Sequence, residues 1–274
     1  MKTCPLVSII TTCYNDGKYL QECIDSVSAQ TYSNIEHIII DDGSTDLDTI
    51  ELLQKISYNS DPKLKIITTL NQGVCKARNQ AITSSKGIYL LPLDSDDYIS
   101  PNLVYLAVKE MEENEHAKLV ASNYKYFGRI NNTVTLEEYS IEKLMGHNLF
   151  VVTTMFRRKD FEKVGGFNIK MDKGLEDWDF WISIMKTGGE VKYLDGINFY
   201  YRMKPINESR NAGSAAVNHT KLRRQMWENN KDLYSLHYPD PLENLEYLNI
   251  LNSKDYRLGK IMLSPVRFFL SLFK

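Results

Sequence analysis

The chain has 274 residues, 43% of them hydrophobic, so it is long enough to bury one large core or two smaller ones. Its 33 Lys and Arg residues against 35 Asp and Glu residues leave a net charge of -2, which excludes the strongly basic surface of a nucleic-acid-binding protein. The four cysteines form no Cys-x-x-Cys pair and no zinc-finger spacing with histidine, so we expect reduced thiols. The first residues do not resemble a signal peptide, and no segment has the roughly 18 apolar residues of a spanning helix, so we expect a cytoplasmic protein.

The first hundred residues alternate between short β-branched or apolar runs and amphipathic segments. Four strands are predicted, at residues 7–12, 35–40, 64–68 and 88–93. Apolar residues at helical spacing follow the first three strands, at residues 19–30, 47–56 and 74–82. This order predicts an α/β fold with an open, mostly parallel, doubly wound sheet and helices on both of its faces.

Three polar clusters come directly after predicted strands. They are Tyr14-Asn15, Asp41-Asp42 and Asp94-Ser95-Asp96-Asp97. Ordinary loop polarity explains one such cluster easily and three poorly. Because ligand crevices of open α/β sheets lie at the carboxyl ends of the strands, we expect the three clusters to border one binding site.

The third cluster crowds three carboxylates, Asp94, Asp96 and Asp97, into four residues. Carboxylates this close repel one another unless a cation lies among them. Their oxygen atoms suit Mg²⁺ or Mn²⁺, which commonly bridge one or two carboxylates and a substrate diphosphate. The alternative is an acidic cap for the helix predicted over residues 101–114, and the cluster by itself leaves both interpretations open.

The second half of the chain has a less regular pattern. Strands are predicted at residues 119–127 and 150–156, a helix at 158–164, a tight turn at 165–167, a helix from 176 to about 188, and edge strands at 191–194 and 199–202. Residues 128–148 show little periodicity and are predicted to form a loop. Trp178 and Trp181, in the helix that Glu176 and Asp177 open, either form a wall that excludes water or stacks on a sugar, or belong to the core.

Beyond Asn207 the sequence becomes helical and more charged. Val266, Phe269, Leu270 and Phe273 recur at helical spacing. Residues 254–274 also hold five basic residues and one acidic residue, Asp255. This combination suits a helix on an anionic membrane surface, and an amphipathic tail docked on its own domain gives the same pattern.

Together these segments resemble the inverting family 2 glycosyltransferases with the GT-A fold, which use nucleotide-diphosphate sugars. The resemblance covers residues 5–205. It rests on the opening strand with Tyr14-Asn15, on Asp41-Asp42-Gly43-Ser44-Thr45-Asp46, on Asn71 to Asn79, on Asp94-Ser95-Asp96-Asp97, and on Gly165-Gly166-Phe167 with Glu176-Asp177-Trp178. Thr12 is a departure, since many members carry proline there.

The resemblance implies a set of donor-binding residues. They are Thr12, Tyr14, Asn15, Asp42, Gly73, Arg78, Asp94, Ser95, Asp96 and Arg202. Tyr14 would stack beside the base and Asp42 would accept a hydrogen bond from it, which favours uracil. Asp96, with Asp97 and Asp94 beside it, would hold Mn²⁺ or Mg²⁺ against the departing diphosphate, and Asp94 would reach the ribose or a metal-bound water. Arg202 would hold the diphosphate or order a lid, with a surface ion pair as the alternative.

The resemblance also implies an acceptor side. Asp177 is the expected general base, which takes the proton of an acceptor hydroxyl as it attacks the sugar from the opposite face, and Glu176 is the alternative base. Residues 1–100 would then bind the nucleotide sugar, 101–205 would bind the acceptor within the same domain, and 206–274 would form a helical extension. A basic, apolar tail fits a glycan or lipid-linked acceptor of surface polysaccharide biosynthesis, by analogy with the family.

Rival classes fit the sequence less well. A dinucleotide-dependent oxidoreductase would need a Gly-x-Gly-x-x-Gly turn after the first strand, where residues 13–17 hold a single glycine. A non-catalytic sugar-nucleotide-binding module on the same fold stays open, although Asp94, Asp96 and Asp177 argue against it. A retaining mechanism would be recognised by the configuration of the product.

Overall fold

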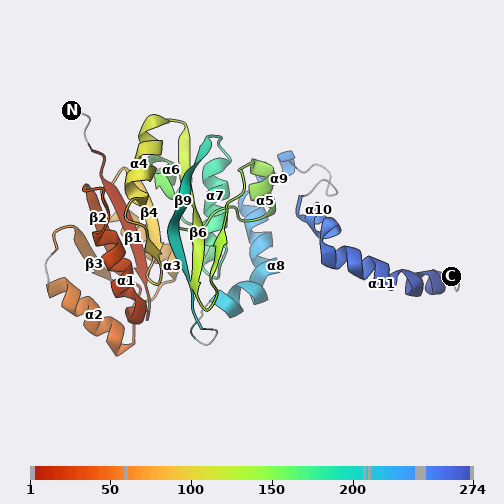
Figure 1. Cartoon of the computed structure of the whole chain (residues 1–274), viewed down its shortest axis with the longest axis horizontal. Helices are drawn as coiled ribbons and strands as arrows, with labels where there is room; N and C mark the ends of the chain where they lie inside the picture. Colours follow the sequence, from red (N-terminus) through yellow and green to blue (C-terminus); the bar gives the residue numbers. More distant parts are fainter. Residues whose placement is uncertain (1–3, 59–60, 206–207, 209–210, 238–244, 272–274) are drawn as a thin grey trace.

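The structure, a computed structural model, describes residues 4–58, 61–205, 208, 211–237 and 245–271. Within these ranges a nine-stranded sheet is flanked by helices (Figure 1). Its strands are β1 (Val7–Cys13), β2 (Ile35–Asp41), β3 (Leu64–Thr68), β4 (Tyr89–Asp94), β5 (Tyr98–Ile99), β6 (Ala117–Gly128), β7 (Asn132–Val134), β8 (Met155–Arg157) and β9 (Glu190–Met203). The helices are α1 (Gly17–Ser28), α2 (Leu47–Tyr58), α3 (Val74–Thr83), α4 (Leu103–Glu113), α5 (Ile141–Gly146), α6 (Arg158–Val164), the 3-10 turn η1 (Ile169–Met171), α7 (Glu176–Met185), α8 (Asn211–Asn229), α9 (Lys231–His237), α10 (Leu245–Asn252) and α11 (Lys254–Ser271).

The strands follow the order β3-β2-β1-β4-β8-β6-β9-β5, with β7 paired to β6. The first four strands by number pair in parallel, as the sequence predicts, and β8 joins them to β6 by antiparallel pairing on both of its sides. The register sets Cys13 opposite Asp41 and Thr12 opposite Asp94. The three polar clusters therefore meet at one edge of the parallel half-sheet, and the predicted α/β class is confirmed.

Alternation along the central strands supplies a core on both faces of the sheet. Ile10 and Leu90 pack on one face with Ala77 of α3, whereas Ile9 and Leu91 pack on the other face. Side chains of a strand point to opposite faces in turn, so strands that are apolar at every position are buried on both sides. These central strands form a rigid base beneath the edge where the polar clusters meet.

Two sequence predictions in the middle of the chain are wrong in part. The strand predicted over residues 150–156 is limited to β8, because Phe150 and Val152 are buried as parts of an irregular segment and not as sheet residues. An apolar run signals burial, and burial does not require a strand. The loop predicted over 128–148 contains β7 and α5, and α5 begins where Ser140 Oγ accepts a hydrogen bond from the Lys143 backbone N–H at 3.2 Å.

The two predicted edge strands at 191–194 and 199–202 form one continuous strand, β9. It pairs in parallel with β6 and lies inside the sheet, because the short β5 pairs along its other side. The register moves from Leu194 opposite Ser122 to Ile197 opposite Asn123, so Asp195 and Gly196 form a bulge. Asp and Gly are typical of turns, so the sequence pattern predicts a break between two strands where the structure has a bulge within one strand.

The C-terminal extension is helical in the part that the structure describes, as predicted. Asn229 and Asn230 both donate side-chain hydrogen bonds to Asp179 of α7, at 3.0 and 3.1 Å, which ties the end of α8 to the sheet domain. Beyond α10, α11 extends away from the body of the protein (Figure 1). Asn207, where the extension is predicted to begin, and Phe273, one of its predicted apolar residues, lie outside the described residues. In the described ranges, no helix has both the length and the apolar character needed to cross a membrane.

Candidate active site

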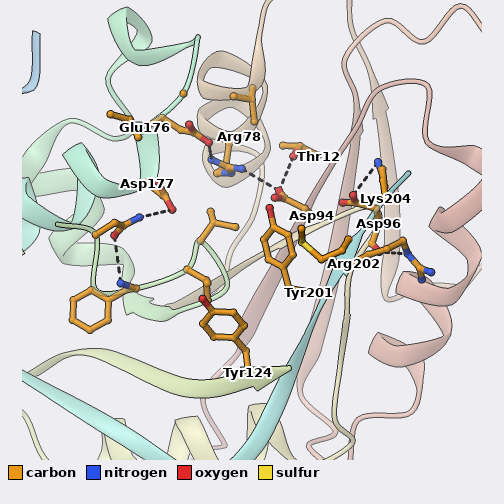
Figure 2. A pocket seen from close by; sticks show the side chains of 18 of the residues that line it. Thr12, Arg78, Asp94, Asp96, Tyr124, Glu176, Asp177, Tyr201, Arg202 and Lys204 are labelled. Carbon is orange, nitrogen blue, oxygen red and sulfur yellow. Dashed lines mark hydrogen bonds and ion pairs between the residues drawn. The ribbon is translucent and has the colours of Figure 1, made fainter. Parts of the chain in front are cut away.

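A cavity of about 1040 Å³ opens at the carboxyl ends of β1 and β4 and is bordered by α3, α7 and the end of β9. Most of the predicted site residues line it. They are Thr12, Tyr14, Asp42, Gly73, Arg78, Asp94, Asp96, Glu176, Asp177 and Arg202. Glu176 and Asp177 of α7 face Asp94, the last residue of β4, across this space (Figure 2). The fold thus brings residues from both halves of the chain to one site.

Three predicted residues, Asn15, Ser95 and Asp97, support the walls without lining the cavity. The Asn15 side chain accepts hydrogen bonds from the backbone N–H groups of two residues in the loop before α2, at 2.7 and 3.1 Å. The Ser95 hydroxyl donates to Asp16 at 3.2 Å. Asp97, only 2% exposed, accepts a hydrogen bond from the Arg202 backbone N–H at 2.7 Å. Each holds a loop of the site in position.

Asp42 is bound to the start of α3. Its two carboxylate oxygens accept hydrogen bonds from the backbone N–H groups of Gln72 and Gly73, each at 2.9 Å. Gly73 has φ +90°, a left-handed conformation that glycine adopts without strain. Tyr14 lines the same end of the site, so an aromatic ring and a fixed carboxylate are available there for a planar, hydrogen-bonding ligand.

Arg78 is a fully buried cation at the wall of the site. Its side chain is 2% exposed and lies 3.1 Å from Asp94 and 3.3 Å from Glu176, and its guanidinium packs over the Phe167 ring. Burial raises the pKa of Asp94, and the positive charge of Arg78 opposes this rise. Arg78 therefore compensates one carboxylate on each side of the cavity.

Asp177 is held at the start of α7. Its Oδ2 accepts a hydrogen bond from Asn148 Nδ2 at 3.0 Å, and its Oδ1 accepts one from the Trp178 backbone N–H at 2.8 Å. Burial raises the pKa of Asp177 to about 7, and the nearby charge of Glu176 adds to the increase. A carboxylate with a pKa near neutrality is well suited to accept a proton from a bound hydroxyl.

The tryptophans beside these carboxylates belong to the core. Trp178 is 5% and Trp181 0% exposed, and neither lines the cavity, so the interpretation as a sugar-stacking wall is wrong. Trp178 Nε1 donates a hydrogen bond to the Leu144 carbonyl of α5, and Trp181 packs against Phe156 of β8, whereas Asp177 lines the cavity. Tyr124 and Tyr201 line the cavity instead, from β6 and β9. Sequence reasoning missed both, because each is one of several tyrosines in an alternating strand.

The end of β9 and the segment just after it contribute two cations, Arg202 and Lys204, to the turn after β4 (Figure 2). Arg202 Nε donates to the Asp96 backbone carbonyl at 2.7 Å, and the guanidinium also pairs with Glu22. Lys204 Nζ lies 2.9 Å from Asp96 Oδ2 and 2.6 Å from Asp16 Oδ1. Sequence reasoning missed Lys204, which follows the last residue of β9 and has no motif of its own.

The carboxylates of the site fit a metal ion whose remaining ligands come from the substrate. Among the described residues, no group of three or more His, Cys, Asp or Glu side chains could hold a metal ion by itself. Asp94 and Asp96 face the cavity, and Mg²⁺ typically binds one or two carboxylates together with substrate phosphates. The cap interpretation of this cluster is wrong, because β5 separates it from α4, whose N-cap residue is Asn102.

Comparison with known sequences identifies relatives. The sequence model of glycosyl transferase family 2 matches residues 8–171. A chondroitin synthase of Pasteurella multocida is 32% identical over 250 residues, which cover 88% of this chain and 25% of that protein. The chain thus spans about a quarter of the length of this relative. An uncharacterized glycosyltransferase of Haemophilus influenzae is 32% identical over 220 residues, which cover 78% of this chain and 85% of that protein.

Solved structures with the same architecture include the 1–349 region of S. aureus TarS in complex with UDP-GlcNAc. It aligns with a TM-score of 0.64 and 20% identity, covering 90% of this chain and 79% of that one. The mannosyltransferase PcManGT from Pyrobaculum calidifontis, in complex with GDP-Man and Mn²⁺, aligns with a TM-score of 0.60 and 16% identity, covering 96% and 85%. The sheet therefore has the GT-A fold of the glycosyltransferase class of enzymes. The chain belongs to glycosyl transferase family 2, and the resemblance found in its sequence is confirmed.

Proposed function

We propose that the protein is an inverting, metal-assisted glycosyltransferase. It moves a sugar from a UDP-sugar to a hydroxyl of a glycan or lipid-linked acceptor in surface polysaccharide biosynthesis. The observation that carries this proposal is the position of Asp177, which has a pKa of about 7 and faces the same cavity as Asp94 and Asp96. When a hydroxyl displaces a diphosphate, a base must take up the hydroxyl proton and a cation must neutralise the leaving group. The cavity has a base on one side and two carboxylates that can bind a cation on the other.

The donor lies, in this proposal, along the half of the cavity built by residues 1–100. Tyr14 stacks beside uracil, and Asp42, held by two backbone N–H groups, accepts a hydrogen bond from the base. Asp94 reaches the ribose or the metal, as its contact with Arg78 keeps it at the cavity wall. The TarS structure in complex with UDP-GlcNAc supports a UDP-sugar as the donor for this fold.

Asp96 and Asp94 are the proposed ligands of Mn²⁺ or Mg²⁺. When bound, the ion would act as a Lewis acid that neutralises the charge of the leaving diphosphate. The Mn²⁺ in the PcManGT structure supports the use of a divalent ion in this fold. Asp97 is buried and accepts a hydrogen bond from the Arg202 backbone N–H. In this proposal it holds β9 against the turn that follows β4.

The acceptor lies in the half of the cavity built by residues 101–205. Its hydroxyl oxygen attacks C1 of the sugar from the face opposite the diphosphate, so the new C–O bond forms as the bond to phosphate breaks. The hydroxyl proton passes to Asp177, the electron pair of the broken bond leaves with the diphosphate, and the anomeric configuration inverts. General bases of this kind contribute about 10² to 10⁴-fold to rate.

The test is calorimetric titration of the purified protein with UDP, in the presence of Mn²⁺ or of EDTA. We expect UDP binding that requires the metal and is lost in Asp96→Ala. The matched control is Asp172→Ala, which removes another carboxylate that lines the cavity and is 38% exposed, and it should leave UDP binding intact. Binding that is indifferent to metal, or absent under all conditions, would contradict the proposal. UDP binding without turnover of any UDP-sugar would favour a non-catalytic sugar-nucleotide-binding module.

We further propose that α11 lies on the anionic inner face of the membrane, which makes the protein a peripheral one. In the described part of α11, the apolar side chains of Leu258, Ile261 and Met262 are 57%, 71% and 69% exposed. Lys260 lies on the opposite side of the helix, and Arg257 lies at the border of the apolar side, as basic residues commonly do on interfacial helices. The helix extends away from the sheet (Figure 1), which argues against a tail docked on its own domain.

Sedimentation with vesicles tests this contact. The full chain should bind vesicles that contain phosphatidylserine more strongly than pure phosphatidylcholine vesicles, and Ile261→Asp should abolish the difference. Ser264→Asp, with the same added charge on a neighbouring turn, should weaken binding less, since Ser264 lies toward the polar side of the helix. Equal binding of wild type and Ile261→Asp would contradict membrane contact through α11.

A further inference from the structure

Lys204 lies between two carboxylates at the point where a metal ion is proposed to bind. Its Nζ is 2.6 Å from Asp16 Oδ1 and 2.9 Å from Asp96 Oδ2. The side chains of Lys204 and Asp16 are 9% and 10% exposed, and that of Asp96 is 22% exposed. The carboxylate of Asp96 therefore already has a cation beside it in the structure of the chain alone.

The ammonium is fixed in this position by the surrounding structure. Two residues before Lys204, the Arg202 side chain binds the Asp96 carbonyl and its backbone N–H binds Asp97. On the other side, Asp16 is held by the Ser95 hydroxyl at 3.2 Å. The end of β9 and the turn after β4 are thus joined at several points, and Lys204 is held where Asp96 presents its carboxylate to the cavity (Figure 2).

A divalent ion that approaches Asp96 meets this ammonium. Two cations within a few ångströms repel in a partly buried site, where charge interactions are several times stronger than in water. Among the residues that the structure describes, no cluster of three ligand side chains offsets this repulsion. A nucleotide diphosphate does so, because it supplies oxygen ligands for the metal and negative charge for both cations.

We propose that Lys204 is a resident counter-ion of Asp96 that makes divalent-metal binding depend on the nucleotide diphosphate. Metal entry displaces the ammonium from Asp96, and a bound diphosphate makes this exchange more favourable. Lys204 acts through Asp96 and is therefore a positioning residue. This inference deepens the proposed function and depends on its metal site at Asp96.

The test is titration of the protein with Mn²⁺ alone and with Mn²⁺ plus UDP, followed by the electron paramagnetic resonance signal of free Mn²⁺. Wild type should bind Mn²⁺ about tenfold or more weakly without UDP than with it. Lys204→Met should bind Mn²⁺ alone about tenfold more tightly than wild type, since one repelling charge is removed. Lys204→Arg, which keeps the charge, should behave as wild type. Lys173→Met removes an exposed lysine of the same cavity and should have no effect.

If Lys204→Met binds Mn²⁺ alone no more tightly than wild type, the counter-ion role is wrong. If UDP changes Mn²⁺ binding in none of the variants, the proposed donor site is wrong. The comparison of wild type with Lys204→Met in Mn²⁺ alone still tests the role of Lys204 in that case. A second measurement applies should Lys204→Met fail to fold. In wild type, saturating Mn²⁺ should raise the rate at which acetic anhydride acetylates Lys204, measured by mass spectrometry, and leave that of Lys173 unchanged. An unchanged rate at Lys204 would overturn the exchange.

Discussion

Arg78 Nη2 lies 3.1 Å from Asp94 Oδ1, and through this contact a buried cation reaches the end of β4 from helix α3. The same guanidinium lies 3.3 Å from Glu176 at the start of α7. The proposed donor and acceptor sides of the cavity therefore share one positive charge. A change at Arg78 should affect the stability of the fold and the geometry of both sides together.

Arg78→Met should lower the free energy of unfolding by about 3 kcal/mol, because it leaves two carboxylates without their partner. This value is at the lower end for broken buried ion pairs, since the Asp94 side chain is 36% exposed. Urea denaturation at pH 7 measures the change. Lys76→Met, an exposed position on the same helix, is the control and should cost little. Equal urea midpoints for wild type and Arg78→Met would mean that the ion pairs add nothing to stability.

The parallel half of the fold follows from the sequence because its determinants are local. Each strand from β1 to β4 is a short apolar run with a helix or a polar turn after it, and periodicity records this directly. The later strands depend on distant partners. β8 forms only because β4 and β6 lie on both sides of it, and β9 remains one strand across Gly196 only because β6 holds it.

The residues of the site also divide into those that the sequence could predict and those that it could not. Asp94 and Asp177 stand in short motifs at strand and helix ends, where sequence spacing carries information. Lys204 and Asn148 acquire their roles through contacts with Asp96 and Asp177, residues far away in the chain. The sequence around a single lysine or asparagine does not indicate which distant residue its side chain contacts. Their identification required the three-dimensional structure.

Asp177→Asn should reduce the rate of sugar transfer by about 10² to 10⁴-fold, the range typical of a lost general base. UDP binding in the presence of Mn²⁺ should stay within about threefold of wild type, because the proposed donor contacts lie on the other side of the cavity. Release of UDP from a turned-over UDP-sugar measures the first quantity and calorimetry the second. Glu176→Gln is the paired variant, and a larger loss there than in Asp177→Asn would reassign the base to Glu176.

The pH dependence of transfer should report the ionisation of Asp177. The carboxylate is the active form of a base, so the rate should rise with pH and level off above about 7, the pKa that burial imposes on this group. Asn148→Ala removes a hydrogen bond that favours the charged form, so the pKa of Asp177 should rise and the ascending limb should move to higher pH. A lower rate with an unmoved limb would mean that Asn148 has only a structural role.

The turn before η1 offers a matched pair of glycines. Gly166 has φ +84°, and a Cβ added there would lie 2.8 Å from Asn79 Oδ1, whereas Gly165 has φ +80° and open space around its Cβ position. The two alanine variants share the cost of a left-handed backbone, so their difference reports the close contacts at Gly166, with Asn79 Oδ1 and with the Phe161 ring at 3.0 Å. Asn79 accepts a hydrogen bond from the Phe167 N–H and donates one to its carbonyl, both at 2.8 Å.

Gly166→Ala should therefore lower the free energy of unfolding by about 1 to 3 kcal/mol more than Gly165→Ala, the range typical of overpacking. It should also weaken UDP binding, because the displaced ring of Phe167 is the surface on which Arg78 packs. Urea denaturation and calorimetry on the two variants measure these effects side by side. If both alanines cost the same, the close approach of Asn79 and Phe161 to Gly166 is not needed to fix the turn.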